Sequence, residues 1–416
     1  MGLVNIIKEI GHTEVFYAPK AGRFCKGLAL LWATMASVQI MGFISVDTFL
    51  PYIGLCLVSI LYCLCDGSVQ FKGRYVFLYL VFLFNVLVLP IEPCFNSKLR
   101  FVQFLIVTLA CSACISSARA IIFRRYVFRY ALMYICILSI GSFFAFFLGV
   151  NYMQVGTQLG LAEYSSNGGT FGGLVNHSMT LGPISMISAL AFYVIYQNNN
   201  SKIFIVLFFL SAMSAVMAAS RSALLGGAVA ILFSLFFMKS NVNGNKKRII
   251  IILCISALVA MPIADRVFAG VLNKQEQRKE QGGALSSRQS KFDCRIDEFM
   301  KSPLLGVGFV SVDPNGNDEY NPVTGQVEPG TSHLAVLSMT GLLGMFAYTL
   351  LLLNAYKTSK RDNSLNAQFV MLLLVAMFTH AWFEGYVLSA GGFLSMTYWM
   401  IVGQNIDCKY ITEHTL

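Results

Sequence analysis

The chain carries little charge for its length. Of its 416 residues, 12% are Asp, Glu, Lys or Arg, whereas 56% are hydrophobic and the mean hydropathy is +0.66. A typical soluble domain is about 25% charged and about 45–50% apolar. This composition excludes an ordinary soluble protein and a disordered chain. Ten-residue segments of alternating hydrophobicity are also absent, which excludes a transmembrane β-barrel and leaves a helical membrane protein.

The chain also lacks the short motifs of several common chemistries. It has no His-Glu-x-x-His or paired Cys/His zinc pattern, no Gly-x-Ser-x-Gly elbow, no Gly-x-x-x-x-Gly-Lys-Ser/Thr loop and no Asp-x-Asp pair. We therefore expect neither a metal ion nor a cofactor. Of the eleven cysteines, only Cys94 and Cys294 fall in segments expected outside the membrane, so we expect no disulfide framework.

Long apolar runs are what the sequence has in abundance. They lie at 27–46, 48–65, 75–90, 101–118, 128–150, 176–196, 203–219, 222–238, 249–264, 333–356, 367–385 and 387–404. A membrane span needs about 20 apolar residues, so the sequence predicts an all-α polytopic membrane protein with about 12 transmembrane helices. We expect spans one to nine in 1–264 and spans ten to twelve, with a cytoplasmic tail, in 333–416. Residues 265–332 would form a long external, periplasmic loop containing short helices.

The placement of Lys and Arg orients these spans. With the N-terminus in the cytoplasm, 19 of the 30 basic residues fall in seven short cytoplasmic segments, and the short external turns hold only Lys98, Arg100 and Arg221. This asymmetry satisfies the positive-inside rule with both termini in the cytoplasm. The net charge of +10 then reflects membrane topology, and we expect no nucleic-acid partner. The other eight basic residues lie in the loop 265–332.

Two features of the external side carry clustered cations. Arg221 begins an apolar run at the outer boundary, where it is either an interfacial arginine or an anion ligand at a helix N-terminus. The stretch 287–303 predicts an amphipathic helix with Arg288, Lys291 and Arg295 on one face. Three like charges on one face repel one another unless an anion or acidic neighbours balance them. This face is therefore either a solvated surface or an anion site.

His333 opens the tenth apolar run on the same expected side of the membrane. A lone histidine at a membrane boundary is commonly a hydrogen-bonded structural residue, but an imidazole that titrates near neutral pH also suits a general base. Arginine binds phosphate through two parallel hydrogen bonds. The arginines and His333 together favour transfer from a lipid-linked diphosphate, whose charged group lies at the outer membrane boundary.

These motifs resemble the O-antigen ligase / O-antigen polymerase superfamily. The resemblance is carried by residues 169–182 with Asn176-His177, by Ser220-Arg221-Ser222, by Arg288 and Phe292 leading to Pro303–Gly308, and by Ser332-His333 leading to Gly341–Gly344. The sequence departs from the family pattern at Phe292, where tryptophan is frequent, and at Leu334, where asparagine commonly follows the histidine.

The resemblance implies a metal-independent, inverting, GT-C-like glycosyltransferase of the bacterial inner membrane, with its active site on the periplasmic face. Its donor would be an oligosaccharide linked to undecaprenyl diphosphate. Arg221 and Arg288 would hold the diphosphate, with Arg295 added from helical spacing, and His333 would take the proton of the acceptor hydroxyl. Weaker candidates for the acceptor or lipid path are Asn176, His177 and Lys291; the first two could instead form a buried polar pair.

The acceptor separates the remaining alternatives. A polymerase accepts another lipid-linked repeat unit, whereas a ligase accepts lipid A–core. We predict a polymerase, because such enzymes are more numerous and more diverse in sequence. Its partners would be the donor, an acceptor glycolipid, membrane lipids and, as a further candidate, a chain-length regulator. A flippase or transporter of lipid-linked oligosaccharide is the alternative of another class, and it would place charges within its spans.

Overall fold

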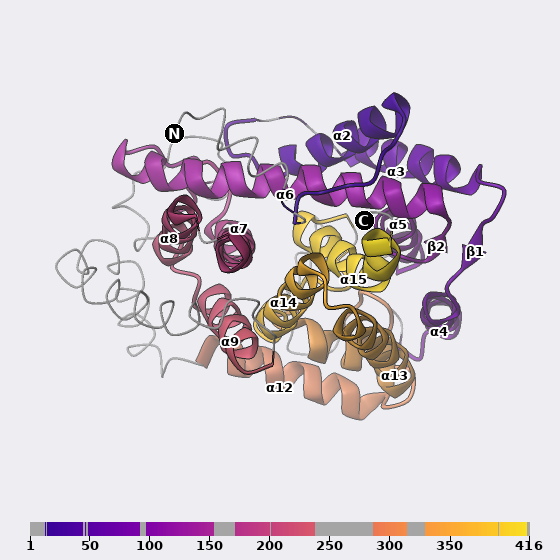
Figure 1. Cartoon of the computed structure of the whole chain (residues 1–416). Coiled ribbons are helices and arrows are strands. Elements are labelled where there is room, and N and C mark those ends of the chain that lie inside the picture. Colours follow the sequence, from indigo (N-terminus) through magenta and orange to yellow (C-terminus); the bar gives the residue numbers. More distant parts are fainter. Residues whose placement is uncertain are drawn as a thin grey trace.

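The computed structural model describes residue 13 and residues 15–44, 46, 49–91, 97–153, 171–199, 201–237, 286–313, 329–389 and 391–413. Within these ranges the chain forms twelve helices and one pair of short antiparallel strands (Figure 1). The helices are α2 (Arg23–Val38), α3 (Phe49–Leu64), α4 (Gly73–Val88), α5 (Ser97–Cys111), α6 (Ala118–Phe147), α7 (Ser178–Asn199), α8 (Lys202–Met217), α9 (Arg221–Phe237), α12 (Ser286–Lys301), α13 (Ser332–Arg361), α14 (Leu365–His380) and α15 (Phe393–Glu413). The strands are β1 (Gln70–Phe71) and β2 (Ile115–Ser116).

The predicted apolar runs correspond closely to these helices. Eleven of the twelve runs coincide with one helix each, and the run at 249–264 lies outside the described residues. The all-α prediction is thus confirmed for the part of the chain that the structure describes. Three helices, α6, α7 and α13, are long and apolar enough to cross a membrane, and α3, α4, α8, α9 and α14 are shorter apolar helices. These helices indicate a membrane protein, whereas the number of about 12 spans stays a prediction.

The relative directions of helices α9, α13 and α14 show which of their ends lie together. Ser332 begins α13 and donates its N–H to the carbonyl of Ala381, just past the end of α14, at 2.8 Å. Further along α13, the ring of Tyr356 lies 6.5 Å from that of Phe233 near the end of α9. The start of α9, the start of α13 and the end of α14 therefore lie at the same end of the bundle. We call this the His333 end.

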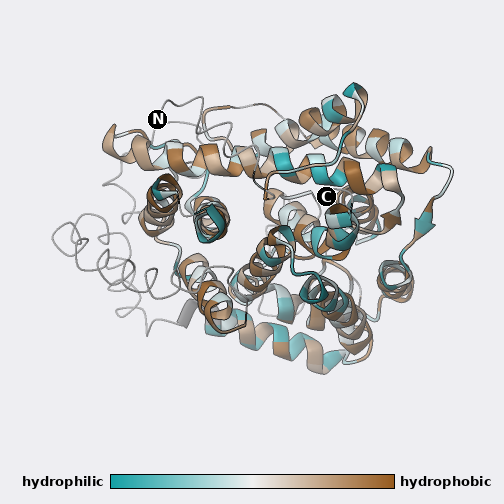
Figure 2. Ribbon diagram, in the orientation of Figure 1, coloured by the Kyte–Doolittle hydropathy of each residue, from teal (hydrophilic) through white to brown (hydrophobic). Residues whose placement is uncertain are grey.

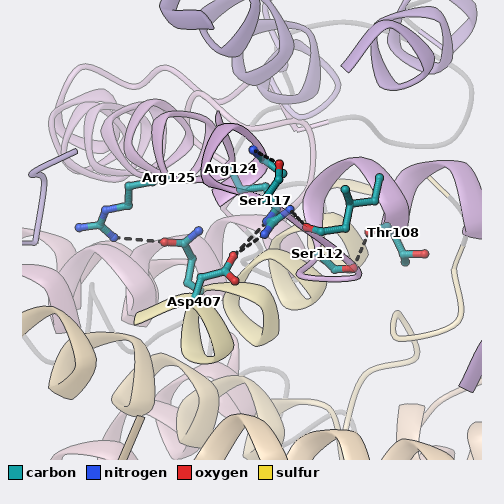
Figure 3. Close-up of polar contacts among 9 residues, drawn as sticks. Thr108, Ser112, Ser117, Arg124, Arg125 and Asp407 are labelled. Carbon is teal, nitrogen blue, oxygen red and sulfur yellow. Dashed lines mark hydrogen bonds and ion pairs between the residues drawn. The ribbon is translucent and has the colours of Figure 1, made fainter. Parts of the chain in front are cut away.

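The opposite end of α14 lies beside a buried polar cluster on α6 and α15 (Figure 3). Arg124 donates from Nε and Nη2 to Asp407 Oδ2 at 3.0 and 2.6 Å, and both side chains are almost fully buried. Arg125 donates from Nε to the carbonyl of Tyr17 at 2.7 Å and from Nη1 to Gln404 at 3.3 Å. The cluster thus joins α6 to α15 and to the segment that precedes α2.

The position of these two arginines differs from the sequence-based expectation. We expected Arg124 and Arg125 in a cytoplasmic connection before a span at 128–150, but α6 already begins at Ala118 and buries both residues. The helix extends because an acidic partner on α15 and free backbone carbonyls are available to the guanidinium groups. The nine cysteines that the structure describes are free thiols, and Cys94, one of the two expected outside the membrane, lies outside the described residues.

Candidate active site

Helix α13 is two helices joined at a break. Gly341 has φ 66° and ψ −169°, a conformation outside the helical region that is almost restricted to glycine. The first part, residues 332–340, carries His333 close to its start, and the second part, residues 342–361, is the long apolar segment. The break therefore lies inside the candidate membrane span Ser332–Arg361 and separates its short histidine-bearing part from its longer part.

The turn 303–308, which follows α12, packs into this break. Val307 donates its N–H to the Ser338 carbonyl at 2.9 Å, and Leu342 donates its N–H to the Pro303 carbonyl at 2.8 Å. These bonds satisfy backbone groups that the interrupted helix leaves open. A Cβ atom at Gly306 would collide with the backbone of Met339. The two glycine motifs of the sequence are thus explained by close contact between their backbones.

We expect substitution of Gly341 by alanine to destabilise the protein strongly. Alanine rarely adopts this backbone conformation, and its Cβ would collide with the carbonyl of Leu304. The free energy of unfolding should fall by roughly 2–4 kcal/mol, which equilibrium unfolding in detergent would measure. Gly54, a helical glycine of α3 with open space around it, is the matched control. Gly54→Ala should stabilise by about 0.5–1 kcal/mol, and equal losses in both variants would contradict the strained break.

His333 is buried and has defined hydrogen-bond partners. Its Nε2 lies 2.9 Å from the carbonyl oxygen of Phe378 on α14, and its Nδ1 lies 3.4 Å from the hydroxyl of Tyr348. A carbonyl oxygen only accepts, so in the neutral ring Nε2 carries the proton and Nδ1 carries the lone pair. The Tyr348 hydroxyl in turn lies 2.5 Å from that of Tyr398 on α15. The basic nitrogen of His333 therefore faces Tyr348 and Tyr398.

Aromatic rings enclose the remainder of the imidazole. The centroid of its ring lies 4.4 Å from that of Phe378 and 4.8 Å from that of Trp382. Trp382 is 40% exposed, whereas His333 is 1% exposed. The indole thus forms the outer wall of the histidine site, and it is the side chain that a ligand approaching from outside would meet first.

Ser332 fastens the start of α13 to the loop between α14 and α15. Its Oγ donates to the carbonyl of Glu384 at 2.5 Å and accepts from the N–H of Tyr386 at 2.9 Å. Its own N–H is bound by Ala381. This loop covers residues 381–392, whereas the predicted apolar runs 367–385 and 387–404 left almost no connection between the two helices. The added length provides the backbone groups that hold the neighbour of His333.

Arg221 is the first residue of α9 and is partly exposed. The turn before it is tightly constrained, because Ala219 has φ 52° and Gly182 of α7 lies directly against Ser220. A Cβ atom at Gly226 would lie 2.7 Å from the carbonyl oxygen of Ala376 on α14. The helices α9 and α14 run antiparallel. Arg221 lies five residues before Gly226 on α9, and Ala381 lies five residues after Ala376 on α14, so Arg221 and Ala381 are at the same level. Arg221 and His333 therefore lie at the same end of the bundle.

Helix α12 forms over the predicted amphipathic stretch, and its cations have different surroundings. Arg288 lies in its first turn, and the side chain is outside the described part of the structure. Arg295 is buried, with Nη1 2.8 Å from Oε2 of Glu298. Glu298 also accepts the N–H of Asp313 at 3.1 Å, and its burial raises the pKa of the carboxyl. The sequence pattern suggested acidic neighbours for this face, and Glu298 is one.

Lys291 connects α12 with the start of α13. A Cβ atom at Gly330 would lie 2.7 and 2.8 Å from Cδ and Cβ of Lys291, so the aliphatic stem lies against this glycine. Gly330 has φ 70°, which favours glycine in any case, and it precedes His333 by three residues. Arg288 is one helical turn before Lys291 on the same helix. The N-terminal half of α12 therefore passes close to the segment that bears His333.

Asn176 and His177 have local structural partners before α7. Asn176 is partly buried and donates from Nδ2 to the carbonyl of Gln39 at 3.0 Å. His177 is exposed, and its Nδ1 accepts the N–H of Met179 at 3.0 Å in the first turn of the helix. The two residues thus do not form the buried polar pair considered from the sequence, and their role in an acceptor path stays a prediction.

Several residues around His333 were not identified from the sequence. Phe378, Trp382, Tyr348 and Tyr398 lie 15 to 65 positions away in the chain, and nothing local marks them. Glu298 was recognisable, because it follows Arg295 by three residues in a helix. Across the described ranges, no three His, Cys, Asp or Glu side chains are grouped to hold a metal ion.

Comparison with known families identifies the segment that contains this site. A family model described as O-antigen ligase matches residues 205–352. The matched segment includes Arg221, α12 and His333 together with the break at Gly341. No curated protein matches the chain.

Proposed function

We propose, from the premise that this chain is a member of the O-antigen ligase and polymerase superfamily, that it is a surface-polysaccharide polymerase of the bacterial inner membrane. It transfers a glycan from undecaprenyl diphosphate to a sugar of another lipid-linked repeat unit on the external face. The observation that carries the proposal is His333, a buried imidazole in the matched segment whose Nε2 is bound to the Phe378 carbonyl. This bond fixes the proton on Nε2, so the basic nitrogen is Nδ1, whose lone pair faces the Tyr348 hydroxyl at 3.4 Å.

The transfer step exchanges one bond for another at the anomeric carbon. The acceptor hydroxyl oxygen attacks this carbon, its proton passes to Nδ1 of His333, and the bond from the carbon to the diphosphate oxygen breaks. Attack opposite the leaving group inverts the configuration. Arg221 and Arg288 bind the diphosphate and stabilise the negative charge that develops on it as undecaprenyl diphosphate leaves. No metal ion is required, because the arginines supply the positive charge.

Arg295 has a different role in this proposal. Helical spacing suggested it as a third diphosphate ligand, but its guanidinium is already balanced by Glu298 in a buried ion pair. Glu298 is bonded to the backbone of Asp313, after the turn that fills the break in α13. We therefore assign Arg295 a structural role within α12, as the counter-charge of Glu298, and no role in holding the diphosphate.

A pair of variants distinguishes a structural role of Arg295 from a role in donor binding. Glu298→Gln leaves Arg295 as an uncompensated buried charge, so the free energy of unfolding should fall by about 3–5 kcal/mol. The double variant Arg295→Met, Glu298→Leu removes both charges and should recover most of this stability. Its KM for the lipid-linked donor should stay close to wild type, whereas Arg221→Ala should raise that KM. If the folded double variant loses donor affinity as Arg221→Ala does, Arg295 binds the donor.

A ligase is the second candidate function. The description of the matching family model names an O-antigen ligase, and a ligase uses the same donor and the same step with lipid A–core as the acceptor. Arg221, Arg288 and His333 would keep their roles, so the residues of the site serve both reactions equally.

Reconstitution with defined lipids tests the proposal. The purified full chain would receive an undecaprenyl-diphosphate oligosaccharide, with and without lipid A–core, in detergent containing a chelator. A polymerase produces a ladder of repeat units without lipid A–core, and a ligase produces a single transfer that requires it. Absence of any covalent product, together with donor movement across vesicles that contain the protein, would overturn the enzyme proposal in favour of a transporter.

A further inference from the structure

Helix α12 has three distinct faces, and one of them is apolar and exposed. Its inner face holds Cys294, Arg295 and Glu298, all buried. On the outside, Ile296 and Met300 lie one turn apart and are 48% and 68% exposed, with the partly buried Phe292 and Phe299 beside them. The remaining edge is polar, with Asp293, Asp297 and Lys301 exposed, and the exposed Gln289 and Ser290 precede them near the start of the helix. Figure 2 shows this alternation of hydrophilic and hydrophobic residues along α12.

The apolar face continues from α12 onto the long part of α13. Leu304, just past the end of α12, is 64% exposed. It accepts the N–H of Leu343 through its carbonyl at 3.4 Å, and the adjacent Leu342 is bonded to Pro303. Leu342, Leu343 and Phe346 are exposed as well. One apolar surface thus runs along α12, across the turn and down α13.

The length of α13 after the break sets the depth of α12. Residues 342–361 form a helix of 20 residues, which at 1.5 Å per residue is about 30 Å long, the thickness of the hydrocarbon core of a bilayer. The last five residues of this helix include Lys357, Lys360 and Arg361, whose long side chains extend toward the opposite membrane surface. The break at Gly341, and α12 beside it, then lie where the hydrocarbon begins.

We propose that α12 is an interfacial helix whose Ile296–Met300–Leu304 face inserts into the acyl chains of the external leaflet of the membrane that the protein spans. Its polar edge with Asp293 and Asp297 faces water, as in other helices that lie in the plane of a membrane surface. Its inner face, which holds the buried Arg295–Glu298 pair, packs against α13. The insertion of this face thereby fixes the depth of α12 at the boundary between headgroups and acyl chains. This inference depends on the exposed faces of the helices and not on the reaction that the protein catalyses.

Quenching of tryptophan fluorescence by brominated lipid tests the proposal. Single variants Ile296→Trp and Met300→Trp would be reconstituted in phosphatidylcholine vesicles, with Asp297→Trp on the polar edge of the same helix as the matched control. The fluorescence of the three native tryptophans is measured in the wild-type protein and subtracted from that of each variant. We expect lipid brominated near the glycerol end of its chains to quench the Ile296→Trp and Met300→Trp signals, and to leave the Asp297→Trp signal nearly unchanged.

Three results would overturn the proposal. Equal quenching at all three positions would mean that α12 is immersed rather than interfacial. Stronger quenching by lipid brominated near the methyl end would mean that the helix lies deep in the bilayer. Protection of Met300→Trp from an aqueous quencher without any quenching by brominated lipid would assign the face to a protein partner or a second copy of the chain. Circular dichroism of each variant confirms that the helices are intact.

Discussion

Replacement of His333 by glutamine is expected to lower the rate of glycan transfer by roughly 10²–10⁴-fold while leaving the protein folded. The amide nitrogen of glutamine reaches the position of Nε2 and can donate to the Phe378 carbonyl, which is now 2.9 Å from the ring. Glutamine has no lone pair that accepts a proton at neutral pH. The variant therefore removes the base and keeps the hydrogen bond. The rate per folded molecule, measured with the lipid-linked donor, checks this result.

Two controls separate loss of the base from loss of structure. His333→Ala should lose both activity and stability, because it also removes the contacts with Phe378 and Trp382. His380 is equally buried at the same end of the bundle, with Nδ1 3.2 Å from the hydroxyl of Tyr386. His380→Asn should lower stability but retain most of the rate per folded molecule. If His333→Gln is as active as wild type, His333 is not the base.

The second large effect is expected at the other end of the bundle, where Asp407→Ala should lower the free energy of unfolding by about 3–5 kcal/mol. The variant leaves the Arg124 guanidinium buried without its counter-charge, since both side chains are 1% exposed in the native protein. Burial of an unpaired charge costs more than the pair contributes. Equilibrium unfolding in mixed detergent micelles, followed by circular dichroism, measures the change.

A surface pair on the same helix provides the matched control. Lys409 and Glu413 lie 3.7 Å apart with exposures of 76% and 57%, and Glu413→Gln should change stability by less than about 1 kcal/mol. The double variant Arg124→Met, Asp407→Leu should recover most of the stability that Asp407→Ala loses, because no charge stays buried. Similar losses of stability in Asp407→Ala and Glu413→Gln would show that burial does not determine the cost of breaking the Arg124–Asp407 ion pair.

The location of the helices could be predicted because the signal is local. Each apolar run is a continuous segment, and hydrophobic length alone indicates a buried or membrane helix. The start of α6 was predicted less well, because charged residues such as Arg124 and Arg125 usually lie outside a membrane span and were placed before it. Their burial depends on Asp407, 283 residues further along the chain from Arg124. A charged residue can continue a buried helix only if such a partner exists, and composition does not reveal partners.

The amino-acid sequence by itself determined the mostly helical, apolar class and the amphipathic helix that became α12, since composition and periodicity are properties of single segments. It also pointed to Arg221, Arg288 and His333 as site residues, and their roles stay a prediction. Only the tertiary structure decided that Arg295 pairs with Glu298 within the protein, that α13 breaks at Gly341 around the turn 303–308, and that His333 Nε2 is held by Phe378. The reason is physical: the direction of a side chain and the protonated nitrogen of an imidazole are set by the groups that meet it in space. For His333 and the break in α13, those groups come from distant parts of the chain.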